Sequence, residues 1–177
     1  MLAGEPYVAD DPELNAERLR AALLTEAFNG TPVDRGEEAR GILKKLLGAF
    51  GDGAEIRAPF FCDYGYNVHL GARSFVNFGL VALDVAPIRI GDDVQMGPGV
   101  QLLTATHPVE PGLRLARVEG ARPITIGDNV WLGGGVIVCP GVSIGRNSVV
   151  GAGAVVVKDL AENVVAVGNP ARVVRSL

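Results

Sequence analysis

The chain has 177 residues, 24 of them glycine, with 48% hydrophobic but only 6% aromatic residues and a net charge of −4. This length suits one ordinary domain whose core consists of small aliphatic side chains. The charge excludes a general basic field for nucleic acid, no apolar run reaches the roughly 18 residues of a membrane span, and no signal-peptide pattern follows Met1, so we expect a cytoplasmic protein.

Residues 1–53 are expected to form a short helical hairpin ahead of the main domain. The first helix is predicted to begin after Asp11, an N-cap residue followed by proline, and to stop at an Asn-Gly pair. The second helix is predicted to begin at Asp34, with Glu37 completing a capping box, and to end at Gly51.

Residues 124–157 carry a repeat of six residues, which fits neither a helix nor simple strand alternation. One aliphatic set comprises Ile126, Leu132, Val138, Ile144, Val150 and Val156, and the set two residues earlier comprises Ile124, Val130, Val136, Val142, Ser148 and Ala154. A glycine follows four members of the first set, where we expect it to provide corners with positive φ. Three hexapeptides make one triangular coil, and such coils must stack into a solenoid to bury their inner faces. An ordinary Val-, Ile- and Gly-rich sheet is the alternative, but it would not keep this register.

The predicted solenoid domain spans residues 54–177 and is interrupted once. Between residues 54 and 103 the sixfold register is present but irregular, and it breaks at residues 83–87. Residues from about 104 to 122 contain no repeat, two prolines and one of the two histidines. A long segment anchored at both ends to a rigid rod is commonly functional.

The two histidines are interpreted differently. His107 lies in the interrupting loop, and imidazole is the natural base near neutral pH for taking a proton from a hydroxyl. His69 lies within the repeat between Val68 and Leu70, where it should point outward. We therefore interpret His69 as structural and His107 as the candidate base.

The motifs CDYGYN, NF, TATHP, VWLGG and GNPAR occur together in this chain. Over nearly its whole length, the chain resembles the maltose O-acetyltransferase and galactoside O-acetyltransferase family. The resemblance implies a mainly β fold, a left-handed parallel β-helix with an N-terminal helical hairpin and an extended loop. It also implies acetyl transfer from acetyl-CoA to a sugar hydroxyl without a metal, in a homotrimer whose sites lie between subunits.

The resemblance assigns a role to individual positions of this chain. The catalytic positions are His107 as general base, Asn77 near the acetyl group and Glu119 near the base. The acceptor-binding positions are Asp63, Phe75, Asn77 and Arg18. The positions expected to bind acetyl-CoA are Trp131, Gly134, Ala152, Val157, Lys158, Arg172 and Arg175. For Glu119 a solvated loop charge, and for Trp131 a coil-surface or interface residue, are the structural alternatives.

Four positions depart from the galactoside branch of the family. Phe75 stands where those enzymes have Tyr, Val85 and Ala9 where they have acceptor-binding Asp, and Gly79 where Asn or Asp is usual. These changes do not affect the acetyl-CoA half of the site, but they leave the identity of the acceptor undetermined. A maltose- or glucose-like sugar, a galactoside, an oligosaccharide or another hydroxyl compound all fit.

The resulting hypothesis is direct transfer in a ternary complex. His107 takes the hydroxyl proton, the oxygen attacks the thioester carbonyl, and a backbone N–H such as that of Gly134 stabilises the oxyanion. Two other classes compete with it. A metal-dependent hydratase would need three histidine ligands for zinc, and a non-catalytic scaffold would need neither the His107 loop nor the basic C-terminal end.

Overall fold

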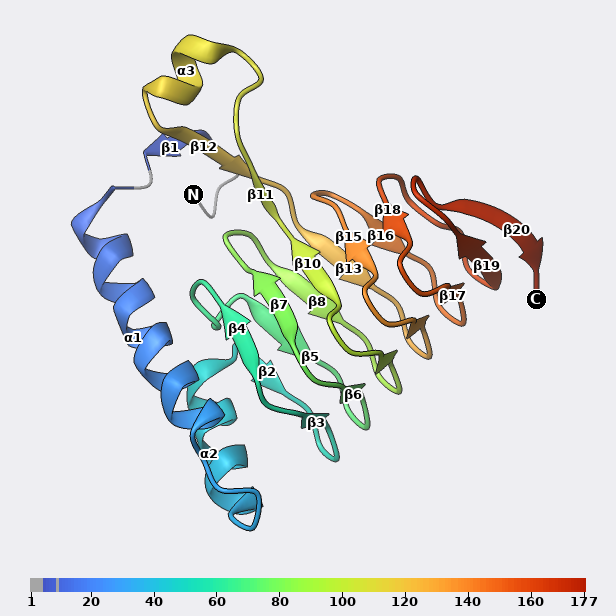
Figure 1. The fold of residues 1–177 in the computed structure, drawn as a ribbon, viewed down its shortest axis with the longest axis horizontal. Coiled ribbons are helices and arrows are strands. Elements are labelled where there is room, and N and C mark those ends of the chain that lie inside the picture. Colours follow the sequence, from blue (N-terminus) through green and yellow to red (C-terminus); the bar gives the residue numbers. More distant parts are fainter. Residues whose placement is uncertain (1–4, 9) are drawn as a thin grey trace.

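The computed structural model describes residues 5–8 and 10–177, so the substitution at Ala9 lies outside the described residues. The repeat folds into a triangular solenoid with the helices at one end, as Figure 1 shows. The coils cross three sheets in turn, which we call sheets 1, 2 and 3. Their strands pair in parallel, except for the last two strands of sheet 2, which are antiparallel. This is the solenoid that the six-residue period predicts.

The sheets stack strands from successive coils. Sheet 1 contains β2 (Ala49–Phe50), β5 (Val68–Leu70), β8 (Ile88–Ile90), β13 (Ile124–Ile126) and β16 (Ser143–Ile144). Sheet 2 contains β3 (Glu55–Ile56), β6 (Phe75–Val76), β9 (Gln95–Met96), β14 (Trp131–Leu132), β17 (Val149–Val150), β19 (Val164–Val167) and β20 (Arg172–Ser176). Sheet 3 contains β4 (Phe60–Cys62), β7 (Leu80–Leu83), β10 (Gln101–Leu103), β15 (Ile137–Val138) and β18 (Val155–Val156). We name each corner by the sheets that it joins.

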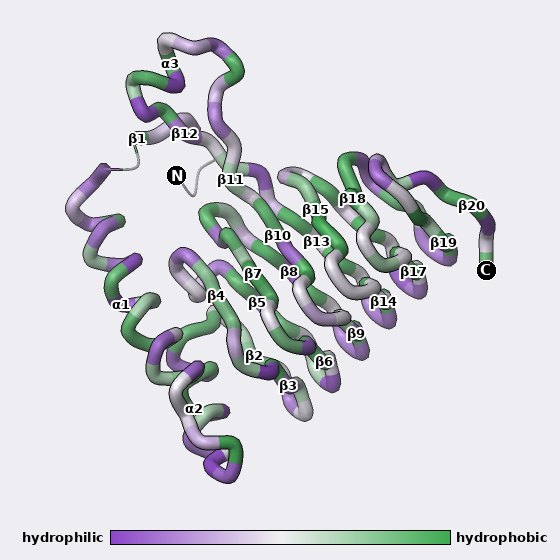
Figure 2. The backbone as a smooth tube through the Cα atoms, viewed as in Figure 1, coloured by the Kyte–Doolittle hydropathy of each residue, from purple (hydrophilic) through white to green (hydrophobic). Residues whose placement is uncertain are grey.

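The core is a narrow column of aliphatic side chains along the solenoid axis. Both predicted sets face inward, and every member is at most 2% exposed. In Figure 2 hydrophobic segments run along the strands, hydrophilic segments gather at the turns, and the two alternate along the helices. Burial of this column drives the stacking, because one coil has no other surface against which to pack.

The glycines that follow the aliphatic residues serve a different purpose from the one predicted. None of the four has a positive φ: Gly127, Gly133, Gly145 and Gly151. A Cβ on Gly127 would lie 2.7 Å from the backbone nitrogen of Arg146 in the next coil, closer than real Cβ atoms approach. Positive φ occurs two residues later instead, as at Asn129 and Gly135. The prediction of positive φ was therefore wrong, and these glycines are needed because the coils approach closely.

Helix α1 (Pro12–Asn29) begins as predicted, but α2 (Gly36–Leu46) does not. Its N-cap position is Arg35, without a side-chain capping bond, so the capping box at Asp34 was wrong. It also ends earlier than Gly51, because the chain becomes extended at Leu47 and enters β2. Pairing with the next coil here overrides the continuing helical pattern. Helix α1 packs against α2 and β4, and none of the helices among the described residues is long and apolar enough to cross a membrane.

The predicted loop is an ordered insertion at corner 3–1, between β10 and β13. It contains β11 (Ala105–Thr106), α3 (Pro111–Leu115) and β12 (Val118–Ala121). Strand β1 (Tyr7–Val8) pairs antiparallel with β12, which also pairs antiparallel with β11. At the root, the Arg122 N–H donates to the Thr104 carbonyl at 2.9 Å, which joins the two ends. The insertion projects beside the solenoid and meets the N-terminal segment there (Figure 1).

Candidate functional site

His107 follows β11 directly and faces a carboxylate on the neighbouring strand. Its Nδ1 lies 4.0 Å from Oε1 of Glu119, and the two side chains are 58% and 22% exposed. The other carboxylate oxygen of Glu119 accepts a hydrogen bond of 2.7 Å from the Tyr7 hydroxyl. A half-buried carboxylate beside an accessible imidazole is a suitable arrangement for a general base.

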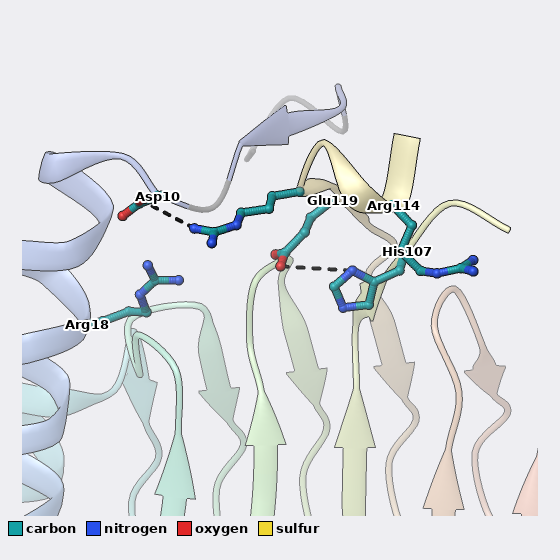
Figure 3. A pocket seen from close by; sticks show the side chains of 6 residues that line it. Asp10, Arg18, His107, Arg114 and Glu119 are labelled. Carbon is teal, nitrogen blue, oxygen red and sulfur yellow. Dashed lines mark ion pairs between the residues drawn. The ribbon is translucent and has the colours of Figure 1, made fainter. Parts of the chain in front are cut away.

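His107 and Glu119 line a cavity of about 430 Å³ together with Asp10, Arg18, Arg114 and Arg117. Figure 3 shows Arg18 reaching toward it from α1, while His107 and Glu119 approach from the insertion. Arg117 forms an ion pair of 3.8 Å with Asp10, and Arg114 donates to the carbonyls of Pro108 and Val109 just after the histidine. The cavity is therefore open and polar, with charges of both signs.

Asp63 lies at corner 3–1 and interacts electrostatically with Arg18 and Glu119, two of the residues that line this cavity. Burial chiefly, and the charge of Asp84 next, raise the pKa of Asp63 to about 6, while Arg18 acts in the opposite direction. Asp84 is fully buried, and one of its oxygens accepts from the backbone N–H groups of Asp63 and Tyr64 at 2.9 Å each. Burial raises the pKa of Asp84, and its backbone hydrogen bonds oppose that rise. Asp84 thus holds the turn that presents Asp63.

A second group of predicted residues lies on sheet 2, away from the cavity. Trp131 is 56% exposed and stands in the outward row of sheet 2 between Gln95 and Val149. The same row begins with Glu55 and Phe75 at one end and reaches Arg175 at the other. An exposed tryptophan followed by a basic strand offers a long surface to a ligand with apolar and anionic parts.

The glycine-rich corner 2–3 carries three more predicted residues. Asn77 follows β6, while Gly134 and Ala152 occupy equivalent turn positions after β14 and β17. The N–H of Gly153 donates to the Gly134 carbonyl, which ties these two coils together. Among the described residues, no hydrogen bond from the Gly134 N–H is present, whereas the N–H groups of Gly133 and Gly135 both donate.

The remaining predicted residues lie elsewhere on the rod. Val157 and Lys158 follow β18 at corner 3–1, the same corner from which the insertion leaves, and Arg172 is exposed on β20. One chain therefore brings together His107, Glu119 and Arg18, with Asp63 beside them. It does not bring the sheet 2 residues and corner 2–3 to this cavity.

Sequence reasoning missed Tyr7, Asp84, Asp10, Arg114 and Arg117. A tyrosine in an N-terminal segment without periodicity does not indicate a strand, so its pairing with β12 was not predictable from pattern. Asp84 carried a usable signal, because it stands in the break of register at residues 83–87, where turn N–H groups need acceptors.

Two family models match separate parts of the sequence. The maltose acetyltransferase hexapeptide capping motif matches residues 1–51, and the bacterial transferase hexapeptide model, with six repeats, matches residues 123–158. Galactoside O-acetyltransferase of Lactococcus lactis is 44% identical over 98% of this chain and 84% of its own length. The chain belongs to the hexapeptide-repeat acetyltransferases of the maltose and galactoside O-acetyltransferase type.

Solved structures agree with this assignment. A maltose O-acetyltransferase from Clostridium difficile is 46% identical and superposes with a TM-score of 0.98, covering 99% of this chain and 94% of the other. A hexapeptide-repeat acetyltransferase from Vibrio cholerae, solved with acetyl coenzyme A, is 37% identical with a TM-score of 0.95, covering 100% and 96%. The fold is the predicted left-handed parallel β-helix, and the chain is an acetyltransferase that uses acetyl-CoA.

Proposed function

We propose that this acetyltransferase transfers the acetyl group to a hydroxyl of a maltose- or glucose-like sugar, with His107 as the general base. The observation that carries the proposal is the His107–Glu119 pair, which lies in an open polar cavity at the only long interruption of the repeat. A sugar offers many hydroxyl donors and acceptors, and this cavity offers carboxylates and guanidinium groups to both.

The reaction is a direct transfer. The imidazole of His107 takes the proton of the acceptor hydroxyl as its oxygen attacks the thioester carbonyl of acetyl-CoA. The tetrahedral intermediate then collapses and the carbon–sulfur bond breaks. The proton held by the His107 imidazolium passes to the leaving sulfur, so that CoA is released as the thiol. The Gly134 N–H, which has no acceptor among the described residues, is a suitable oxyanion donor.

Asp63 and Arg18 are proposed to bind the acceptor, with Phe75 and Asn77 contributing from a second surface. A carboxylate and a guanidinium on two sides of a cavity can bind several hydroxyl groups at fixed angles. The relatives named for galactoside and for maltose leave a galactoside or an oligosaccharide as the alternative acceptor.

We propose further that the working unit is a homotrimer with each site between two chains. In one chain His107 lies at corner 3–1, whereas Trp131, Gly134 and Ala152 lie on sheet 2 and at corner 2–3. A second chain that places its sheet 2 side against the insertion would bring both halves together. Closed symmetry then repeats the same contact around a ring.

The proposal is tested by thiol release from acetyl-CoA with a panel of glucose, maltose, alkyl galactosides, oligosaccharides and an amine. General-base assistance contributes roughly 10²–10⁴ in rate, so His107→Ala should lose about that much while still folding. His69→Gln is the matched control, because it changes the other histidine, which lies on sheet 1 away from the cavity. Full activity in His107→Ala would contradict the assignment, and the preferred acceptor identifies the substrate class.

A further inference from the structure

The insertion and the N-terminal strand place three polar side chains in one cross-strand row. Tyr7 of β1 stands directly opposite Glu119 of β12. On the other side of β12, Thr106 stands opposite Gly120 in an antiparallel pair, so one further step of that register brings His107 opposite Glu119. Side chains directly opposite each other across a sheet point to the same face. The order across the sheet is therefore Tyr7, Glu119, His107.

The contacts follow this row. The Tyr7 hydroxyl donates to one oxygen of the Glu119 carboxylate at 2.7 Å, and the other oxygen faces Nδ1 of His107 at 4.0 Å. Each oxygen of the Glu119 carboxylate therefore faces a different partner. A carboxylate held at one oxygen has little freedom to turn, so the direction of the other oxygen is set by the tyrosine.

The environment of Tyr7 fits this role. Burial, and then the hydrogen bond to Glu119, raise the pKa of Tyr7 above its ordinary range. The hydroxyl therefore remains a donor at any pH at which the enzyme works. The segment after β1 is also linked to the insertion, because Asp10 forms an ion pair with Arg117.

We propose that Tyr7 is a positioning residue for the acetyl transfer, and that the N-terminal strand aligns the base through the row Tyr7–Glu119–His107. Glu119 receives the Tyr7 hydrogen bond on one oxygen and presents the other to Nδ1, so that Nε2 of His107 faces the acceptor hydroxyl. A carboxylate near one imidazole nitrogen favours the proton on that nitrogen, which leaves the other ring nitrogen free to accept one. This inference rests on the proposed role of His107.

The test is a double-mutant cycle with Tyr7→Phe and Glu119→Gln, assayed by thiol release with the preferred acceptor. Tyr7→Phe keeps the ring and the strand pairing and removes only the hydroxyl. We expect kcat to fall roughly tenfold, as for a small misplacement of a reacting group, with the KM values for both substrates within about twofold of wild type. The double variant should be no slower than Glu119→Gln alone, because Tyr7 acts through Glu119.

Tyr66→Phe is the matched control, since the Tyr66 hydroxyl also lies beside a carboxylate, that of Glu17, but not beside Glu119. It should retain wild-type kcat. An unchanged kcat in Tyr7→Phe, or losses that multiply in the double variant, would overturn the inference. His107→Ala in the same assay separates the two proposals. If His107→Ala is fully active, both the assignment of the base and the positioning role of Tyr7 are wrong. If His107→Ala is inactive while Tyr7→Phe has wild-type kcat, only the positioning role of Tyr7 is wrong.

Discussion

At the scale of single residues, the acceptor side of the cavity is an electrostatic cluster rather than a set of independent groups. The charges of Asp84 and Glu119 both raise the pKa of Asp63, and the charge of Arg18 lowers it. Burial supplies the largest part of the effect on Asp63. When a carboxyl group is costly to ionise in the free enzyme, hydrogen bonds donated by a ligand stabilise its charged form most strongly.

This environment predicts a pH-dependent stability for which Asp63 is responsible. Its pKa is raised from 3.8 to about 6 in the folded chain. A raised pKa means that Asp63 contributes stability below about pH 4 and that this contribution is lost as the pH rises through 6. The stability of Asp63→Asn relative to wild type should therefore increase between pH 4 and pH 7. The gain should be well below about 3 kcal/mol, the value of the whole shift, because Asp63 is partly exposed and solvent screens its charge.

The measurement is thermal or urea unfolding of both proteins at pH 4.5, 6 and 7.5, because their difference cancels the carboxyl groups that they share. Glu5→Gln, a change at an exposed carboxyl group, is the control and should show a flat difference. A flat difference for Asp63→Asn as well would mean that this carboxyl group titrates normally.

At the scale of the elements, the two helices differ in how they begin. The Asp11 carboxylate accepts from the N–H of Glu13 at 2.8 Å and of Leu14 at 3.3 Å, whereas α2 has no side-chain cap. Asp11→Ala should therefore cost about 0.5–2 kcal/mol of unfolding free energy, the usual value of a cap. Asp34→Ala, which removes the cap that the sequence pattern indicates, should cost less than about 0.5 kcal/mol.

Urea unfolding of the two variants beside wild type checks this pair. Equal losses in both would show that the Asp34 carboxylate has a role in the folded chain that its position does not explain. A stable Asp11→Ala would show that packing of α1 against β4, rather than its cap, holds the helix.

Sequence reasoning predicted some elements of this fold and missed others. The period of six located the inward residues correctly, because burial along a rod is a local pattern that each coil repeats. The prediction for the end of α2 was wrong. Phe50 continues the helical pattern of apolar residues, but it pairs with the next coil as part of β2. The strand at Tyr7–Val8 depends on pairing across more than 100 residues, and no local pattern records such pairing.

Within the candidate site, the motifs singled out His107, Glu119, Arg18 and Asp63. The fold brings these four residues near one another, and their roles stay predictions. The hydrogen bond between Tyr7 and Glu119 was not predicted, because it joins the first strand to the insertion, which is far away in the sequence. The glycines were located correctly but for the wrong reason. A period shows where a glycine recurs, and only the spacing of the coils shows that a Cβ would collide there.

At the scale of the whole molecule, the two groups of residues proposed to form the site lie on different surfaces of one chain. Its corner 3–1 presents His107, and its sheet 2 presents an exposed Trp131 in a row that leads to Arg175. A rigid parallel rod does not fold back to join these surfaces. If both surfaces belong to one site, as proposed, a neighbouring copy must supply one of them, and a closed ring of three copies would form three equal sites.

This arrangement predicts complementation between two impaired variants. His107→Ala lacks the proposed base, and Trp131→Ala lacks the aromatic surface proposed for acetyl-CoA. If each site takes His107 from one chain and Trp131 from its neighbour, random mixing of equal amounts rebuilds about a quarter of the sites with both residues intact. Co-expression should then give close to a quarter of wild-type activity at low acetyl-CoA concentration, well above either variant alone. If both residues served a site within one chain, no mixture could rebuild it, and activity would equal the average of the two parents. Sedimentation analysis of the same samples supplies the independent check, since a shared site requires an assembly of at least two chains and the proposal requires three.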